Sequence, residues 1–200
     1  TLQIFIVKKL VCYWQDAHII TNKHVIANSL IGKFHVTFAN AEGLPDIGNH
    51  QQFQFDNFEQ RCVKHPDPNV DLAAFLIGPL VNQIQQSGNR LFYIPLQTNL
   101  IPSDEERATY SSMEDIVMIG YPNGIWDATN NLPVIRKGIT ATHSNVAWNG
   151  KNEFLTDVAS FPGSSGSPVF LANIGGYMDN RGNTFMGSHR LNNHRLKTVG

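Results

Sequence analysis

Short apolar runs, closely spaced and interrupted by Gly, Pro and Asn, limit the fold of this chain more than any other feature of its sequence. Runs of this kind that are rich in Val, Ile, Thr and Phe are typical of β-strands bounded by turns. No helical periodicity interrupts them. We therefore predict an all-β fold, with strands at 4–11, 18–21, 34–38, 52–58, 62–64 and 72–77, and then at 116–120, 134–142, 153–157 and 168–171, before a last hairpin around 179–183.

A polar segment divides these strands into two sets. Between about residues 79 and 114 the chain becomes polar, and Ser103 with Glu106 has the spacing of a helix capping box. Two successive sets of about six strands suit a pair of β-barrels. We expect an N-terminal barrel at 1–80, a connector at 81–114 and a C-terminal barrel at 115–200, together forming one domain.

Composition argues against several classes of function. Of the 200 residues, 42% are hydrophobic and 16% are charged, which is enough to bury a core. The 15 basic and 16 acidic residues give a formal net charge of -1, and no block of like charge occurs. This balance provides neither a nucleic-acid footprint nor a polybasic membrane patch. No apolar run reaches the roughly 20 residues that a membrane span requires.

The cysteine content does not support a disulfide framework. Cys12 and Cys62 are the only two cysteines, and we expect both to be free, buried thiols. Residues 1–11 lack the pattern of a signal peptide. These two features favour a cytoplasmic location over a secreted or periplasmic one.

A candidate nucleophile lies in a glycine-rich turn directly before an apolar strand. The segment 161–170 reads FPGSSGSPVF, with Ser165 at its centre. Glycine at positions 163 and 166 permits backbone angles that would turn the N–H groups of Gly163 and Ser165 to one side, where they could bind a developing oxyanion. A serine hydroxyl alone is a poor nucleophile, so this segment predicts a base elsewhere in the chain.

Two further segments provide that base and a group to orient it. His24 follows an apolar strand, and histidine is the side chain best suited to proton transfer at neutral pH. Asp71 comes directly before Leu-Ala-Ala-Phe, which is an unusual context for an ordinary surface charge. The order His, Asp, Ser along the chain is that of the chymotrypsin type of triad and differs from the order in α/β-hydrolases.

Together these motifs resemble the trypsin-like peptidases of the chymotrypsin superfamily, especially bacterial types without disulfides. Residues 21–25 (TNKHV) are similar to the histidine segment of glutamyl endopeptidases and HtrA proteases, 71–73 (DLA) to the aspartate motif, and 156–168 to the serine motif. The segments 117–122 and 136–142 also resemble the second barrel of this family. The resemblance implies two six-stranded antiparallel Greek-key barrels, a catalytic triad of His24, Asp71 and Ser165, and an oxyanion hole formed by Gly163 and Ser165.

Both ends of the chain depart from the family pattern. No Gly-rich strand precedes the histidine segment, and residues 189–197 are polar and basic where the family has an apolar strand. We therefore expect the two barrels to be incomplete at both termini.

The resemblance places the substrate pocket a few residues before the serine, at Ala159 and Ser160. No acidic residue occupies the expected base of this pocket, so the sequence does not predict the selection of Lys or Arg. Asp67, in a turn between two prolines, and Asp56, on an alternating strand, are rival acids for the triad. The eight histidines show no metal-binding spacing, and we expect no metal and no cofactor.

The sequence thus predicts a serine endopeptidase that hydrolyses peptide bonds through an acyl-enzyme intermediate. Two alternatives stay open at this point. One is a catalytically inactive barrel that binds peptides or a partner protein, and the other is a serine esterase that uses the same groups. Cleavage-site preference and oligomeric state do not follow from the sequence.

Overall fold

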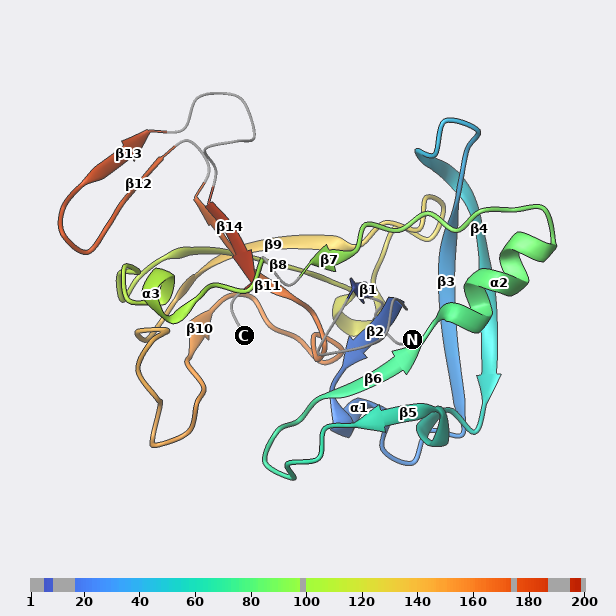
Figure 1. Ribbon diagram of the computed structural model, residues 1–200, viewed down its shortest axis with the longest axis horizontal. Helices are drawn as coiled ribbons and strands as arrows, with labels where there is room; N and C mark the ends of the chain where they lie inside the picture. Colours follow the sequence, from blue (N-terminus) through green and yellow to red (C-terminus); the bar gives the residue numbers. More distant parts are fainter. Residues whose placement is uncertain (1–5, 9–16, 98–99, 174–175, 187–194, 199–200) are drawn as a thin grey trace. The chain divides into compact units, whose positions relative to one another are not determined.

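The computed structural model describes residues 6–8, 17–97, 100–173, 176–186 and 195–198 (Figure 1). In the first half of the chain its elements are β1 (Ile6–Lys8), β2 (Ala17–Thr21), α1 (Lys23–Ile26), β3 (Ile31–Ala39), β4 (Pro45–Asp56), η1 (Phe58–Arg61), β5 (Cys62–Lys64), β6 (Ala73–Leu76), α2 (Gly78–Gln86) and β7 (Leu96–Gln97). The second half contains α3 (Asp104–Arg107), β8 (Asp115–Gly120), η3 (Pro122–Gly124), β9 (Val134–Thr140), β10 (Thr156–Asp157), β11 (Val169–Asn173), β12 (Gly176–Met178), β13 (Thr184–Met186) and β14 (Arg195–Thr198).

The contacts divide the chain into two compact units. The first unit comprises residues 1–98, 121–134 and 162–167, and the second comprises 99–120, 135–161 and 168–200. Each unit is therefore assembled from segments that are far apart in the sequence. The short segment around Ser165 belongs to the first unit.

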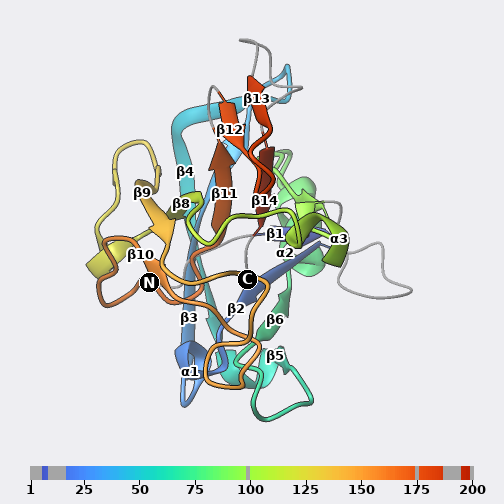
Figure 2. The same ribbon diagram turned by 90° about the vertical axis from the view of Figure 1, so that its left-hand side faces the viewer.

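The first unit contains a mixed sheet and a long hairpin. The sheet has the strand order β5-β6-β2-β1-β7, and β2 pairs antiparallel with β6 from His18↔Leu76 to Thr21↔Ala73. The hairpin pairs β3 with β4, the two longest strands in the described part of the chain (Figure 2). The register of β2 and β6 matters most for the site, because it brings the ends of these two strands together.

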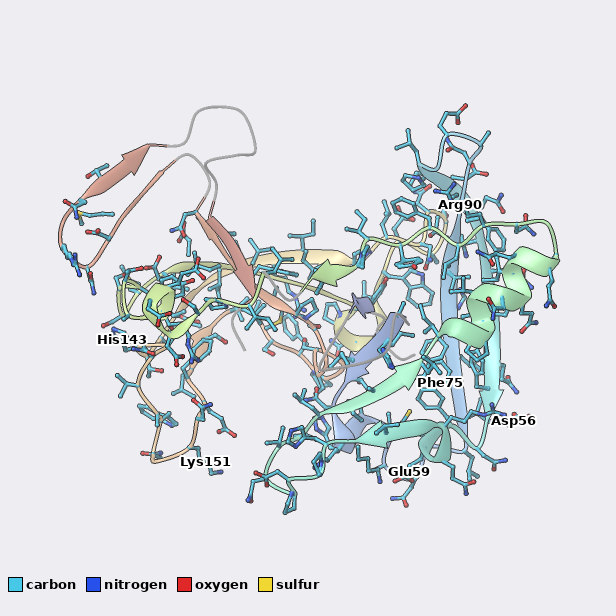
Figure 3. All side chains as sticks on the ribbon, viewed as in Figure 1. Asp56, Glu59, Phe75, Arg90, His143 and Lys151 are labelled. Atoms are coloured by element: carbon cyan, nitrogen blue, oxygen red, sulfur yellow. The ribbon has the colours of Figure 1, made fainter. Side chains whose placement is uncertain are left out.

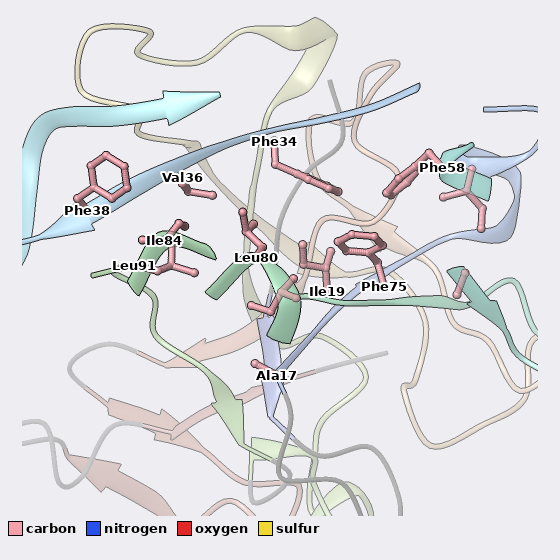
Figure 4. Close-up of a cluster of buried hydrophobic side chains, with 13 residues drawn as sticks. Ala17, Ile19, Phe34, Val36, Phe38, Phe58, Phe75, Leu80, Ile84 and Leu91 are labelled. Atoms are coloured by element: carbon pink, nitrogen blue, oxygen red, sulfur yellow. The ribbon is translucent and has the colours of Figure 1, made fainter. Parts of the chain in front are cut away.

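The core of the first unit is rich in phenylalanine. Phe34 on β3 is fully buried, and its ring centroid lies 5.4 Å from that of Phe58 and 5.3 Å from that of Phe75 (Figure 4). Leu80 and Ile84 of α2 pack into the same cluster. Burial of these large side chains supplies the main driving force for the unit.

The second unit is built on one five-stranded sheet with the order β10-β9-β8-β11-β14 and a separate hairpin, β12–β13. Its buried cluster contains Tyr110, Ile116 and Leu171. Within the described ranges neither five-stranded sheet closes on itself. The fold is therefore mostly β with few helices, as predicted.

Most predicted elements are present. Strands lie in all the predicted regions of the described chain, and a hairpin surrounds residues 179–183. The capping box is also confirmed, since the Ser103 hydroxyl accepts a hydrogen bond from the Glu106 N–H and the Glu106 carboxylate accepts one from the Ser103 N–H. Of the strand predicted at 4–11, only residues 6–8 lie within the described part.

Three expectations need correction. The strand predicted at 52–58 begins earlier, because β4 starts at Pro45 and its first, polar residues pair with β3. Residues 78–86, next to and within the predicted connector, form the helix α2 with Pro79 in its first turn. The polar C-terminal region contains a strand, β14, which pairs antiparallel with β11.

Cys62 is a free thiol and is half-buried, and Cys12 lies outside the described residues. Burial, together with the nearby Glu59, raises the pKa of the Cys62 thiol to about 11. Among the described residues, no helix has both the length and the apolar content that crossing a membrane requires.

Candidate active site

His24 is presented by a single helical turn at the end of β2. The strand β2 ends at Thr21, and α1 begins two residues later at Lys23. Ile26 in this turn is fully buried and anchors it to the core, whereas the His24 side chain is 59% exposed. The apolar residues on both sides therefore fix the backbone while the imidazole faces outward.

Asp71 reaches His24 because of the strand register. Thr21 pairs with Ala73 at the last rung of the β2–β6 ladder. In an antiparallel pair, residues just after the end of one strand face those just before the start of the other. Residues 22–24 and Asp71 therefore meet directly beyond the ladder.

Several hydrogen bonds hold the Asp71 carboxylate. The His24 N–H donates to Oδ1 at 3.1 Å, and Nδ1 of the His24 ring lies 2.5 Å from Oδ2. Burial opposes ionisation of the Asp71 carboxyl, but hydrogen bonds from the His24 ring and from the N–H groups of His24 and Lys23 outweigh it, so that its pKa lies below the ordinary value. The carboxylate is thus ionised and directed at the ring near neutral pH.

Ser165 lies in a pair of consecutive turns that need glycine. Gly163 has a φ of +85° and Gly166 a φ of +81°, in the left-handed region that favours glycine. The loop is supported at Pro162, whose carbonyl accepts a hydrogen bond from the Asn123 N–H at 2.7 Å. The neighbouring Ser164 is buried, whereas Ser165 is exposed.

The three predicted residues form one continuous chain of hydrogen bonds. The second ring nitrogen of His24, Nε2, lies 2.9 Å from Oγ of Ser165. A ring that donates from Nδ1 to a carboxylate leaves Nε2 free to accept the serine proton. All three residues belong to the first unit, so the arrangement does not depend on how the two units are placed.

A family model for the trypsin-like peptidase domain matches residues 10–175 of the sequence. The chain belongs to the trypsin-like peptidase domain family. This is a family of serine proteases, which are hydrolases that act on peptides or proteins.

The other comparisons add little to this assignment. The chain is similar to a crystal structure of Rv3671c from M. tuberculosis, the inactive form of a serine-to-alanine mutant, with 16% sequence identity and a TM-score of 0.33 over 91% of this chain and 70% of that chain. At this score the similarity supports no further argument. No curated protein matches the sequence.

The rival acids of this trypsin-like peptidase domain make other contacts. Asp56 lies at the end of β4 (Figure 3). Its carboxylate accepts a hydrogen bond from Gln54. The Asp67 carboxylate accepts the N–H of Asn69. Of the three acids, Asp71 is the one that the structure brings to the His24 ring.

The predicted pocket residues of the peptidase domain lie in the second unit. Ala159 and Ser160 are exposed, and the Ala159 carbonyl accepts a hydrogen bond from Nη1 of Arg136 at 2.8 Å. Within the described residues, no group of three or more His, Cys, Asp or Glu side chains is arranged to hold a metal ion.

Sequence reasoning missed Asn22, which lies close to the three predicted residues of the peptidase domain. Its Nδ2 donates a hydrogen bond to the Asp71 carbonyl at 2.8 Å. An Asn directly before a helical turn ordinarily indicates a capping residue, so the sequence carried no sign of this contact. The pairing of β2 with β6 was the missing information.

Proposed function

We propose that this trypsin-like peptidase domain is a serine endopeptidase with Ser165 as nucleophile, His24 as general base and Asp71 as the group that orients the imidazole. The observation that carries the proposal is the continuous chain from Asp71 Oδ2 through the His24 ring to Ser165 Oγ, with distances of 2.5 Å and 2.9 Å. A serine hydroxyl within reach of an oriented imidazole is the arrangement that activates it for attack on a carbonyl.

The proposed reaction proceeds in two halves. Ser165 Oγ attacks the carbonyl carbon of the peptide bond while its proton passes to Nε2 of His24. The imidazolium then returns this proton to the amine that leaves, and an acyl-enzyme remains on Ser165. Water, deprotonated by His24, attacks the ester in the same way and releases the acid. Asp71 stays ionised throughout, in keeping with its lowered pKa.

The N–H groups of Gly163 and Ser165 are the proposed oxyanion hole. The positive φ of Gly163 supports this role, because a turn of this kind can direct successive N–H groups to one side. Ala159 and Ser160 remain the proposed lining of the substrate pocket.

The domain organisation is part of the same proposal. We propose six-stranded barrels at 1–80 and 115–200 joined by a connector at 81–114. Support comes from the family match, which extends over residues 10–175 and therefore covers most of both regions.

Labelling with a fluorophosphonate probe tests the proposed triad, because this reagent reacts with activated serines. We expect the parent chain to be labelled and Ser165→Ala to show no labelling. His24→Ala should react at least about 10⁴-fold more slowly than the parent. Ser112→Ala and His143→Ala are matched controls, since Ser112 is exposed and His143 contacts its own loop at Asn145. Both should react at the parent rate.

The outcomes separate the candidate functions. Labelling that persists in Ser165→Ala would contradict the proposed nucleophile. A folded parent chain without labelling would favour the inactive binding barrel. If the probe labels Ser165, turnover of a small ester without cleavage of any peptide library member would instead favour the esterase.

A further inference from the structure

Asn22 occupies the position of a helix cap but does not act as one. It is the N-cap residue of α1, and its side chain makes no capping hydrogen bond. Asn at this position ordinarily accepts a hydrogen bond from an N–H of the first turn. Here its Nδ2 instead donates to the main-chain carbonyl of Asp71, 49 residues away in sequence.

This hydrogen bond lies where the sheet stops holding the two segments together. The last main-chain pair between β2 and β6 is Thr21↔Ala73, so Asn22 and Asp71 both lie beyond the ladder. The Asn22 amide extends the connection between the two segments by one further contact.

Packing does not fix Asp71 in place. Its side chain is 47% exposed, and the preceding loop contains Pro66 and Pro68 in a run without regular secondary structure. Hydrogen bonds therefore determine where the carboxylate lies, and the main chain of Asp71 is held by Asn22.

Two hydrogen bonds of different kinds join the segment 22–24 to Asp71. Asn22 binds the main chain of Asp71, and the main-chain N–H of His24 binds the Asp71 carboxylate. The amide of Asn22 also lies near the serine loop, because a Cβ added to Gly166 would lie 3.8 Å from Asn22 Oδ1. Asn22 is thus positioned between the segments that provide Asp71 and Ser165.

We propose that Asn22 is a positioning residue that holds the main chain of Asp71 so that its carboxylate meets Nδ1 of His24. The inference rests on the proposed triad. It assigns to Asn22 a role in the reaction that acts through Asp71 and not through the substrate.

Kinetics of Asn22→Ala provide the first test. We expect kcat and the rate of fluorophosphonate labelling to fall about 10- to 100-fold, as small displacements of a catalytic group do, while KM stays within about twofold. The control is Asn69→Ala, in the loop that leads to Asp71. The Asn69 side chain is exposed and makes no hydrogen bond within the described residues, so this variant should keep the parent rates.

A second readout does not depend on activity. The second readout is the ¹⁵N spectrum of the histidines, with the His24 signals assigned by their loss in His24→Ala. In the parent, the neutral form of the ring should carry its proton on Nδ1, which faces the Asp71 carboxylate. The Asp71→Asn variant gives the ¹⁵N chemical shifts of a His24 ring that has lost its carboxylate partner, which serve as the reference signature. We expect Asn22→Ala to shift the His24 signals toward that signature and Asn69→Ala to leave them unchanged.

The two readouts separate the two proposals. His24 signals in Asn22→Ala that match those of the parent would overturn the positioning role, and so would equal losses of rate in Asn22→Ala and Asn69→Ala. A parent chain that does not react with the probe would overturn the endopeptidase proposal, whereas the ¹⁵N shifts would still decide whether Asn22 holds Asp71 at the ring. Asn22→Ala should stay folded because Asn22 is only half-buried, and its thermal midpoint, measured alongside, checks this.

Discussion

At the scale of single residues, the candidate site depends on backbone conformation as much as on reactive side chains. Ser165 is exposed at the centre of two turns because Gly163 and Gly166 adopt positive φ values. Gly166 also lies close to β2, since a Cβ at this position would be 3.1 Å from Thr21 Oγ1. Thr21 is buried and precedes Asn22, so the glycine lets the serine loop approach the segment that bears His24.

Gly166→Ala should damage both the fold and the site. A side chain at positive φ costs about 1–2 kcal/mol, and here it also presses on Thr21. We expect urea denaturation to show a loss of at least this size in the free energy of unfolding. The rate of fluorophosphonate labelling should fall about 10-fold or more. Gly182→Ala is the matched control, because Gly182 has a φ of +83° but nothing within 4 Å of the added Cβ.

Gly182→Ala should lose only the about 1–2 kcal/mol of unfolding free energy that a side chain at positive φ costs, and it should keep the parent labelling rate. Equal labelling rates in the two variants would contradict a role for the close approach between Gly166 and β2.

At the scale of elements, one aromatic cluster ties together the strands that position the site. Phe34 on β3 contacts Phe55 on β4, Phe58 on η1 and Phe75 on β6, with ring centroids 5.3 to 5.4 Å apart. Gly32 makes room for the cluster, since a Cβ there would lie 2.3 Å from the Phe58 ring. The segment bearing Asp71 leads directly into β6, so the cluster stabilises the strand next to the site.

Phe34→Ala should therefore destabilise the protein severely. Truncation of a fully buried Phe removes its burial and leaves a cavity, at a cost of about 3–5 kcal/mol in the free energy of unfolding. Ile31→Ala on the same strand is the control, because Ile31 is 52% exposed and should lose about 1 kcal/mol or less. Urea denaturation of both variants measures the difference, and similar losses would contradict the central place of Phe34.

The elements also show how far sequence patterns extend. The alternation of Phe53 and Phe55 predicted the second half of β4, from residue 52 onward, and both side chains are half-buried. The first half of β4, from Pro45 to Gln51, is mostly polar. It forms a strand because it pairs with β3, and no local sequence pattern predicts this pairing.

The helix α2 was missed for a different reason. Its sequence does carry helix signals, with Pro79 in the first turn and buried Leu80 and Ile84 at an i, i+4 spacing, but the segment is short and lies beside the polar connector.

At the scale of the whole molecule, all three proposed catalytic residues belong to one of the two compact units. Residues 162–167 group with residues 1–98 and 121–134, although the chain around them belongs to the second unit. The stability of the first unit and the integrity of the site are therefore coupled. The ionisation of Asp71 should affect the free energy of unfolding as well as the hydrogen bonds of the site.

The pH dependence of unfolding tests this coupling. Asp71 has a lowered pKa in the folded protein, compared with about 3.9 in the unfolded chain, so the folded state binds its proton less readily. Its contribution to stability is complete above about pH 4 and is lost as the pH falls through the folded-state pKa. In thermal unfolding, the midpoint of the parent should lie above that of Asp71→Asn at neutral pH, and this difference should shrink as the pH falls below about 4. A difference that does not change with pH would contradict the bonds assigned to the carboxylate.

The sequence by itself determined which residues are candidates and which kind of fold holds them. The turn around Ser165, the histidine after an apolar strand and the acid before Leu-Ala-Ala-Phe are local patterns, and local patterns follow from backbone sterics and burial. Only the tertiary structure decided that Asp71, and not Asp56 or Asp67, meets His24, and that Asn22 holds it there. Both contacts arise from the register of β2 against β6, which long-range burial selects and which no segment of the sequence encodes alone.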